Sequence, residues 1–428
     1  MIDLKQLRSA PDQVRAALAR RGDPGVLALL AELQQLDEQR RASATRLDGL
    51  KAQRNEFAKT DALLVKQHGK LPAEVADERR RHGAQIAALE AELRNLEAAL
   101  EAKQLFVPNL PLPDVPDGDA SAAPVVRTWG TPAPAGGSPH WEIAERLGIL
   151  DLKRGAKLSG SGFPVFVGAG ARLVRGLLAF MLDLHTKEHG YVECEPPFLV
   201  RREIMQGTGQ LPKFEEDAYR TEPDDLFLVP TAEVPLTNLL RDELLDGASL
   251  PRSFVAYTPC FRREAGAAGK DTRGLLRVHQ FDKVELVRFC RPEESAAEHE
   301  KLVRHAEEVL RRLELPYRVV LIPAGELGFA NAKQFDIEVW APAVGAWLEV
   351  SSASVYTDYQ ARRANIRFRP RTGGKPEFVH TLNASGVALP RTIAALLETR
   401  QQADGSVSVP PALVPYVGTD RFAPAGAS

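Results

Sequence analysis

Cysteine is scarce in this chain, with three residues among 428. Cys194, Cys260 and Cys290 lie far apart in the sequence, and none belongs to a Cys-x-x-Cys pair. A disulfide framework or a cysteine-based zinc site needs more cysteines at closer spacing. The sequence therefore predicts buried free thiols and no zinc.

Long apolar runs are missing as well. No stretch approaches the roughly 20 apolar residues of a membrane-spanning helix, and the opening residues MIDLK lack a secretory signal pattern. Hydrophobic residues make up 44% of the chain and charged residues 26%, as in soluble globular proteins. We expect a cytoplasmic protein without membrane contact, and two domains, because 428 residues exceed one ordinary core.

An excess of either charge is absent, since 55 Lys and Arg face 57 Asp and Glu. A chain-wide basic surface for nucleic acid is thereby excluded, so any such contact must be local. The sequence also contains neither a GxGxxG turn nor a GxxxxGK[ST] loop. Neither a dinucleotide-binding Rossmann fold nor a P-loop is indicated.

What the chain does have is a narrow apolar stripe over residues 26–105. A seven-residue spacing runs from Val26 to Phe57, interrupted by Arg40, Ser43 and Arg54, and a second apolar run covers residues 86–100. Helices that pack only on each other show such narrow stripes. With Gly69 and Pro72 as turn residues between the runs, the pattern predicts an antiparallel helical hairpin.

The far end of this hairpin is basic. Residues 40–81 contain eleven Lys or Arg and six Asp or Glu, a net charge of +5. A solvated helical surface is the ordinary interpretation of a charge run, whereas an excess of one sign on an arm favours contact with phosphates. The residues alone leave both open. The candidate contacts near the tip are Arg54, Lys59, Lys66, Lys70, Arg79 and Arg80.

Beyond the hairpin, residues 107–139 hold many prolines and then Gly and Ala, as linkers do. Further on, residues 334–340 alternate apolar and polar side chains, and residues 347–355 also have strand character. No regular βαβ repeat is present. We predict an α+β protein with an N-terminal domain at 1–106, a linker at 107–139, and an antiparallel sheet flanked by helices at 140–428.

The most informative segment is residues 260–264 (CFRRE), a Gly-rich loop, and residues 277–285 (RVHQFDKVE). Two strand-like runs flank the loop and carry Arg262 and Glu264 on one side and Arg277 and Phe281 on the other. Guanidinium groups neutralise phosphates and an aromatic face stacks a base, so the hairpin suits a nucleoside triphosphate. A hairpin with ordinary surface charges is the alternative for the segment alone.

This segment resembles motif 2 of the class II aminoacyl-tRNA synthetases, and in detail that of the seryl-tRNA synthetases. The resemblance covers nearly the whole chain, with further landmarks in the family's order at residues 207–214, 231–233, 349–352 and 381–386. It implies the class II sheet, a homodimer, and a ligase that makes seryl-adenylate from L-serine, ATP and Mg²⁺. It also implies transfer of serine to tRNA(Ser), with tRNA(Sec) as a further acceptor, and an arm that grips the tRNA.

The resemblance also implies roles for individual residues. Arg262 and Arg391 are the expected catalytic residues, and Glu349 and Ser352 the Mg²⁺ ligands. The expected serine-binding residues are Thr231, Glu233, Arg262, Glu285 and Ser385. The expected ATP-binding residues are Arg262, Glu264, Arg277, Val278, Phe281, Glu349, Val350, Ser351, Ser352 and Arg391. For Glu285, an ordinary ion pair with Lys283 or Arg288 is the alternative.

Two positions depart from the family's last motif, because Ala384 and Pro390 stand where glycine is usual. A methyl group at 384 could obstruct an approach of the backbone to substrate. These changes, together with a run at residues 353–358 that is unusual for the family, motivate the hypothesis of a duplicate enzyme with altered inhibitor sensitivity. A paralogue that delivers the activated amino acid to a carrier protein or metabolite is a second hypothesis, which the basic arm disfavours. A non-catalytic RNA-binding protein is a third, which the retained arginines disfavour.

Overall fold

The computed structural model describes residues 1–265, 273–371 and 373–424, so most of the predicted Gly-rich loop lies outside the described residues. The chain divides into two compact units. One contains Ile2–Ala19 and Asp23–Val107, and the other contains Met1, Arg20–Gly22 and Pro108–Ser428. Among the described residues, no helix has the length and apolar character needed to cross a bilayer.

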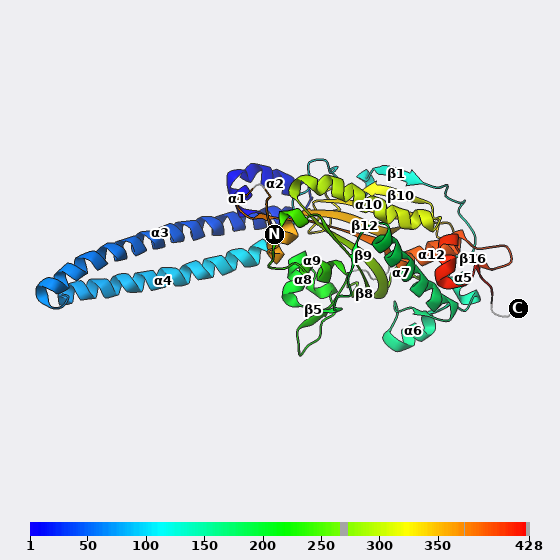
Figure 1. Cartoon of the computed structure of the whole chain (residues 1–428), viewed down its shortest axis with the longest axis horizontal. Helices are drawn as coiled ribbons and strands as arrows, with labels where there is room; N and C mark the ends of the chain where they lie inside the picture. Colours follow the sequence, from blue (N-terminus) through cyan, green and yellow to red (C-terminus); the bar gives the residue numbers. More distant parts are fainter. Residues whose placement is uncertain (266–272, 372, 425–428) are drawn as a thin grey trace. The chain divides into compact units, whose positions relative to one another are not determined.

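The first unit is a pair of long helices with two short ones, α1 (Leu4–Ser9) and α2 (Pro11–Ala19). The helices α3 (Pro24–His68) and α4 (Ala73–Gln104) run side by side, which confirms the predicted hairpin (Figure 1). Asp23 caps the start of α3 by accepting from the Gly25 amide at 2.8 Å. The helix ends at Gly69, whose φ of 75° suits glycine.

Two buried polar side chains of α3 have polar partners, and one of them, Ser43, is an interruption of the apolar stripe. Ser43 is buried and donates a 2.7 Å hydrogen bond to Glu92 of the facing helix. Asp37, also buried, accepts two hydrogen bonds from the Arg8 guanidinium, at 2.6 and 2.7 Å. Because both buried groups have partners, neither leaves an unpaired polar atom between the helices.

The second unit is built on an eight-stranded sheet in the order β1-β10-β11-β12-β15-β9-β8-β4. All neighbouring strands in it are antiparallel except β4 and β8, which confirms the predicted sheet type. β1 lies within the segment expected to be a linker. The strands are β1 (Val125–Trp129), β4 (Val192–Glu193), β8 (Arg252–Phe261), β9 (Gln280–Cys290), β10 (Tyr317–Leu321), β11 (Lys333–Ala341), β12 (Ala346–Thr357) and β15 (His380–Ala388).

Helices α7 (Ala169–Lys187), α10 (Ser295–Arg312) and α12 (Leu389–Thr399) share one hydrophobic core with a face of this sheet. Cys260 and Cys290 are buried free thiols, whereas Cys194, also free, is partly exposed. Shorter helices are α5 (His140–Arg146), α6 (Leu152–Ser159), α8 (Arg202–Thr208), α9 (Glu233–Asn238), α11 (Tyr359–Ala364) and α13 (Val414–Val417). Shorter strands are β2 (Leu150–Asp151), β3 (Val165–Phe166), β5 (Leu199–Arg201), β6 (Leu226–Leu228), β7 (Leu244–Asp246), β13 (Arg367–Arg369), β14 (Glu377–Phe378), β16 (Val407–Ser408) and β17 (Arg421–Phe422).

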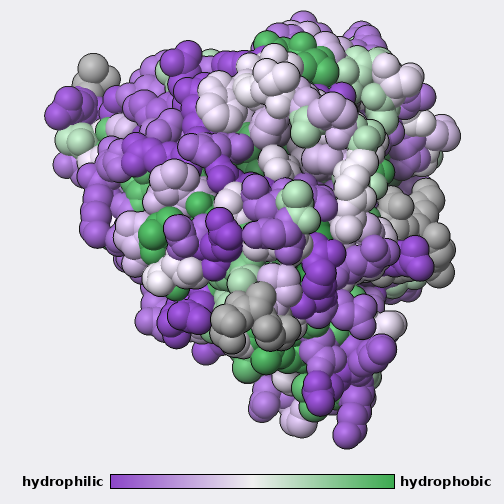
Figure 2. Space-filling view, turned by 90° about the vertical axis from the view of Figure 1, so that its right-hand side faces the viewer, coloured by the Kyte–Doolittle hydropathy of each residue, from purple (hydrophilic) through white to green (hydrophobic). Residues whose placement is uncertain are grey.

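The outer surface mixes residue types. In Figure 2, hydrophobic residues form separate patches among hydrophilic ones on the face shown. Scattered exposed apolar residues of this kind are ordinary for a folded protein.

The two faces of the sheet differ because side chains alternate along each strand. On β9, Val284 and Leu286 enter the core, whereas Lys283 and Glu285 point to the opposite face and line a cavity. The neighbouring strands repeat this alternation. On β15 the core residues are Leu382 and Ala384 and the cavity residues Asn383 and Ser385, and on β12 the core residues are Ala353 and Val355 and the cavity residues Ser352, Ser354 and Tyr356.

Ala384 is thus turned away from the cavity. It is buried in the core and pairs in register with Ala353 on one side and Leu286 on the other. A methyl group there meets the helix layer and does not obstruct the cavity. Pro390 does line the cavity, in the first turn of α12, where proline is tolerated. Of these two departures, Pro390 is therefore the one placed to affect a ligand in the cavity.

Candidate active site

A cavity of about 770 Å³ lies on the sheet face that carries Lys283 and Glu285, away from the main hydrophobic core, and its volume is typical of small-molecule sites. It brings together nearly every residue expected to bind serine or ATP. Ser351 is the exception: its buried hydroxyl donates to the Ser385 carbonyl at 2.7 Å, away from the cavity. The expected residues that line the cavity are Thr231, Glu233, Arg262, Glu264, Arg277, Val278, Phe281, Glu285, Glu349, Val350, Ser352, Ser385 and Arg391.

The β8–β9 hairpin positions the guanidinium and aromatic groups. Phe281 pairs with Cys260 in the strand register, and the Arg262 amide donates to the His279 carbonyl at 2.9 Å. The Arg262 guanidinium carbon lies 5.1 Å from the centre of the Phe281 ring. The guanidinium is therefore within cation–π range of the ring, and both side chains line the cavity.

Glu264 and Arg277 contact each other across the mouth of the hairpin. The Glu264 backbone has a φ of 53°, and its Oε2 accepts from Arg277 Nε at 2.6 Å, with Nη2 at 2.5 Å. Both side chains are expected to contact the nucleotide. A phosphate would compete with Glu264 for Arg277, so the pair must rearrange when both residues bind ligand.

The floor of the cavity is acidic. The Asn383 amide donates to Glu233 at 3.1 Å and to Glu285 at 2.8 Å, so one side chain joins the two buried carboxylates. Lys283 lies 2.5 Å from Glu285 and donates to the Thr231 hydroxyl at 2.9 Å. Two carboxylates with one ammonium group leave a negative balance when both acids are ionised. The floor therefore favours a cationic group on the ligand.

Glu233 has an altered protonation equilibrium. Burial, and then the negative charge of Glu285, raise its pKa to about 7, although a hydrogen bond from Gln360 at 2.6 Å favours the ionised form. The Thr381 hydroxyl in turn donates to the Gln360 carbonyl oxygen at 2.7 Å. The carboxylate is thereby held in one orientation from behind. A ligand ammonium group would restore its negative charge at neutral pH.

Sequence reasoning did not select four of these residues: Lys283, Tyr356, Gln360 and Asn383. The Tyr356 hydroxyl donates to the Asn383 side-chain oxygen at 2.9 Å, which orients the amide group. Lys283 could have been recognised, because it lies two positions before Glu285 on a strand and side chains at that spacing share a face. Lys283 is also the actual partner of Glu285, since Arg288 pairs with Glu298.

At another end of the cavity, the oxygen groups of Glu349 and Ser352 lie near Arg391. The Ser352 hydroxyl donates to Glu349 Oε1 at 2.8 Å, and Asp336 pairs with Ser352 in the strand register. Burial, followed by the charge of Glu349, raises the pKa of Asp336 to about 7. Arg391 donates to the Glu349 carbonyl at 2.9 Å and to the Leu276 carbonyl at 3.0 Å.

These oxygen groups fit a hard cation that takes part of its coordination from elsewhere. Glu349 and Ser352 offer a carboxylate and a hydroxyl side by side on the cavity wall. Among the described residues, no three His, Cys, Asp or Glu side chains converge as metal ligands. Mg²⁺ commonly binds through one or two carboxylates plus phosphate oxygens and water, so the pair suits Mg²⁺.

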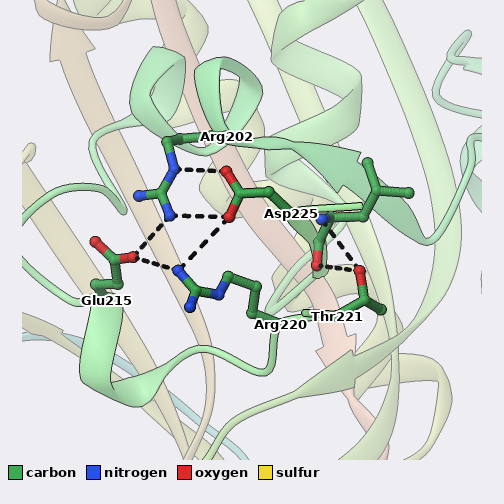
Figure 3. Close-up of polar contacts among 6 residues, drawn as sticks. Arg202, Glu215, Arg220, Thr221 and Asp225 are labelled. Carbon is green, nitrogen blue, oxygen red and sulfur yellow. Dashed lines mark hydrogen bonds and ion pairs between the residues drawn. The ribbon is translucent and has the colours of Figure 1, made fainter. Parts of the chain in front are cut away.

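A network of ion pairs braces one rim of the cavity (Figure 3). Arg202 contacts Asp225 at 2.8 and 3.0 Å and Glu215 at 2.8 Å, and Arg220 also contacts Glu215 at 3.2 Å. The adjoining segment contributes Phe214, Asp217 and Ala218 to the cavity lining. All four charged side chains are partly exposed, so the network orders this rim more than it stabilises the fold.

The basic residues of the helical hairpin differ in their availability. Arg54, Lys59, Lys66, Lys70 and Arg80 are exposed. Arg79 is only 21% exposed: it forms an ion pair with Asp61 of the facing helix at 3.1 Å and covers the Phe57 ring at 3.7 Å. Arg79 therefore links the two helices, and the other five side chains are better placed for an external partner.

Comparison with known proteins adds independent findings. A family model described as the seryl-tRNA synthetase N-terminal domain matches residues 1–111. A second model, the class II tRNA synthetase core domain (G, H, P, S and T), matches residues 213–400. The serine–tRNA ligase of Gemmatimonas aurantiaca is 55% identical, with 98% of this chain and 99% of that protein covered. The serine–tRNA ligase of Thermomicrobium roseum is 53% identical, with 98% and 94% covered.

Solved structures of seryl-tRNA synthetases are also similar to this chain. The seryl-tRNA synthetase of Pyrococcus horikoshii, crystallised with ATP, superposes with a TM-score of 0.93 at 38% identity. That match covers 99% of this chain and all of the other. The cytoplasmic serine–tRNA ligase of Naegleria fowleri, in complex with AMP, gives a TM-score of 0.85 at 29% identity, covering 97% and 96%. The likeness therefore extends over both units of the chain.

Proposed function

The chain belongs to the seryl-tRNA synthetase family, and from that premise we propose that it activates L-serine with ATP and transfers the seryl group to tRNA(Ser). One observation carries the assignment to the cavity: an acidic floor and Arg262 lie in the same 770 Å³ space. An amino acid needs a negative site for its ammonium group and a positive site for its carboxylate. The cavity offers both.

The proposed serine site is the floor. The ammonium group would lie near Glu233 and Glu285, and Thr231 and Ser385 would add polar contacts. Serine is small, so discrimination against alanine must come from buried polar groups that alanine would leave unpaired. The hydrogen bonds that orient Glu233 and Asn383 before any ligand arrives support this role.

The proposed nucleotide site consists of the β8–β9 hairpin and the end of the cavity that holds Glu349, Ser352 and Arg391. Arg262 would meet the α-phosphate and the serine carboxylate, Phe281 and Arg391 would enclose the adenine, and Glu264 and Arg277 would contact the adenine end and the distal phosphate. Glu349 and Ser352 would hold Mg²⁺, which neutralises phosphate charge when bound. The serine carboxylate is ionised at neutral pH, so the residues need to position two anions and need no general base.

We further propose that the exposed basic residues of the α3–α4 helical hairpin contact tRNA(Ser). We also propose that the protein acts as a cytoplasmic homodimer. The hairpin proposal is supported by the net charge of +5 over residues 40–81 and by five exposed cations near the tip. Contacts of this kind recognise shape and phosphate positions and do not read bases. The dimer and the compartment are expected from the family.

The proposed reaction is tested by pyrophosphate exchange into ATP with each amino acid in turn, followed by charging of total tRNA. Serine alone should support strong exchange. Arg262→Ala should lower the serine-dependent rate by about a hundredfold or more, because a positioned cation at developing charge is lost. Arg263→Ala is the matched control, since that neighbour is exposed and lies outside the cavity lining. Near-normal exchange by Arg262→Ala would refute its role.

A further inference from the structure

The wall of the cavity that lies across the sheet from the β8–β9 hairpin is irregular backbone. Gly328, Phe329, Ala330 and Asn331 line the cavity, and they lie between β10 and β11 without helix or strand structure. A segment outside any ladder must find other donors for its carbonyls. The side chains that donate to these carbonyls therefore fix the position of this wall.

Arg21 donates hydrogen bonds to three of the five backbone carbonyls from Leu327 to Asn331. Its Nη1 donates to Leu327 and Gly328 at 3.1 and 3.3 Å, and its Nη2 donates to Asn331 at 2.6 Å. Its Nε donates to the Asn109 carbonyl at 2.7 Å. One planar guanidinium thus meets four backbone oxygens, a geometry that the single ammonium of lysine cannot reproduce.

Asn109 donates to the other two carbonyls, those of Phe329 and Ala330. Its amide donates to the Phe329 carbonyl at 2.9 Å, and its side chain donates to the Ala330 carbonyl at 2.9 Å. The same side chain also donates to the Tyr356 carbonyl at 2.7 Å. All five consecutive carbonyls of the wall therefore accept from Arg21 or from Asn109, which Arg21 itself holds.

We propose that Arg21 is a positioning residue for the serine site, acting through this wall. It is absent from the cavity lining, so any effect on substrate must pass through backbone. The path to the floor is short, because Asn109 holds the Tyr356 backbone and the Tyr356 hydroxyl orients Asn383. Asn383 holds both carboxylates of the floor.

The physical state of Arg21 suits this role. Burial lowers the pKa of its guanidinium to about 10, so the group remains a cation at neutral pH. Its hydrogen bonds are therefore charge-assisted and stronger than those between neutral groups. Losing them leaves the partly buried carbonyls of Leu327, Asn331 and Asn109 without this donor, and the wall would move to recover partners.

The test compares Arg21→Met with Arg20→Met in the full-length protein. Arg20 is a matched control, because it donates to the Leu112 and Val115 carbonyls and to Asp117, all outside the cavity lining. Arg21→Met should raise the KM for serine in pyrophosphate exchange on the order of tenfold, with a smaller change in kcat. Arg20→Met should leave the serine KM within about twofold of the wild type.

Guanidinium rescue separates positioning from general destabilisation. Millimolar guanidinium chloride should restore part of the serine affinity of Arg21→Ala and none of any loss in Arg20→Ala. An unchanged serine KM in folded Arg21→Met, or an equal rise in both methionine variants, would overturn the proposal. If Arg21→Met does not fold, Arg21→Lys carries the test: a folded lysine variant with a wild-type serine KM would also overturn it.

This inference rests on the proposed function, and the two can fail separately. Absence of serine-dependent exchange in the wild-type protein would refute the function. Exchange in the wild type with no difference between the Arg21 and Arg20 variants would leave the function intact and refute only the role of Arg21.

Discussion

At the scale of single residues, burial decides what each acid can do. Glu233 is buried beside another carboxylate and has a pKa of about 7, while a hydrogen bond from Gln360 limits its orientation. It can therefore change charge near neutral pH, unlike an exposed glutamate. A bound ammonium group would favour the ionised form and release a proton when Glu233 starts protonated.

Serine affinity should consequently depend on pH. Below pH 7 the free protein holds Glu233 mainly as the neutral acid, so serine must displace a proton and the serine KM rises. Above pH 7 that cost disappears. We expect the serine KM to fall about fivefold between pH 6 and 7 and to level off towards pH 8, as a single group with a pKa of about 7 requires.

Glu233→Gln provides the control. The amide cannot ionise, so its serine KM should be high and should lose this pH dependence, as measured by pyrophosphate exchange at saturating ATP. A wild-type pH profile in the variant would assign the titration to another group. Asp336 is the obvious candidate, because its pKa is also raised to about 7.

At the scale of elements, the strands separate the cavity from the core by alternation. Strand β15 interrupts that alternation after Ser385, where its register with β9 shifts and Gly386 is the extra residue. A Cβ at this glycine would lie 2.8 Å from Nε2 of His185, a buried side chain of α7. The bulge thus needs glycine because the helix layer leaves no space for a methyl group.

Gly386→Ala should therefore destabilise the protein by about 1–3 kcal/mol, the usual cost of overpacking a core. It should also lower exchange activity, since Ser385 adjoins the bulge. Gly49→Ala is the matched substitution: Gly49 lies within α3 with open space around it, so alanine there should stabilise the helix slightly. Denaturant unfolding of both variants measures the difference. Equal stability of Gly386→Ala and wild type would contradict this account.

At the scale of the whole molecule, the chain contains two compact units with different chemistry. The hairpin unit has its own apolar contacts among Leu47, Ile86 and Leu89, and its tip carries exposed cations. The sheet unit contains the entire cavity lining. Changes at the tip should therefore affect tRNA and leave adenylate formation intact.

The combined variant Lys59→Ala, Lys66→Ala, Lys70→Ala and Arg80→Ala tests this separation. Its Kd for tRNA(Ser) should rise about tenfold or more, and the salt dependence of binding should weaken by roughly one unit of slope per lost phosphate contact. Serine-dependent pyrophosphate exchange should not change. Replacing the exposed Lys153, Arg154 and Lys157 of α6 controls for a general loss of positive charge. Unaltered tRNA affinity would show that the tip is not the contact.

Local patterns determined much of this protein. The seven-residue spacing specified the hairpin, and the alternation along β9, β12 and β15 specified which side chains share a face, because helix and strand periods act over a few residues. The roles of Arg262, Glu285 and Glu349 were expected from the resemblance to the family's motifs, which periodicity alone does not supply. Arg79 was identifiable as a cation, yet the structure places it between the helices.

Tertiary structure alone decided how the site is held. Gln360 supports Glu233 from a different element, Asn383 joins two carboxylates from two further elements, and Arg21 supports a wall more than 300 positions away in the chain. No local period reports such neighbours, because folding brings them together and burial then sets their charge and hydrogen bonding. The sequence determined which chemical groups are available, and the fold decided which of them meet.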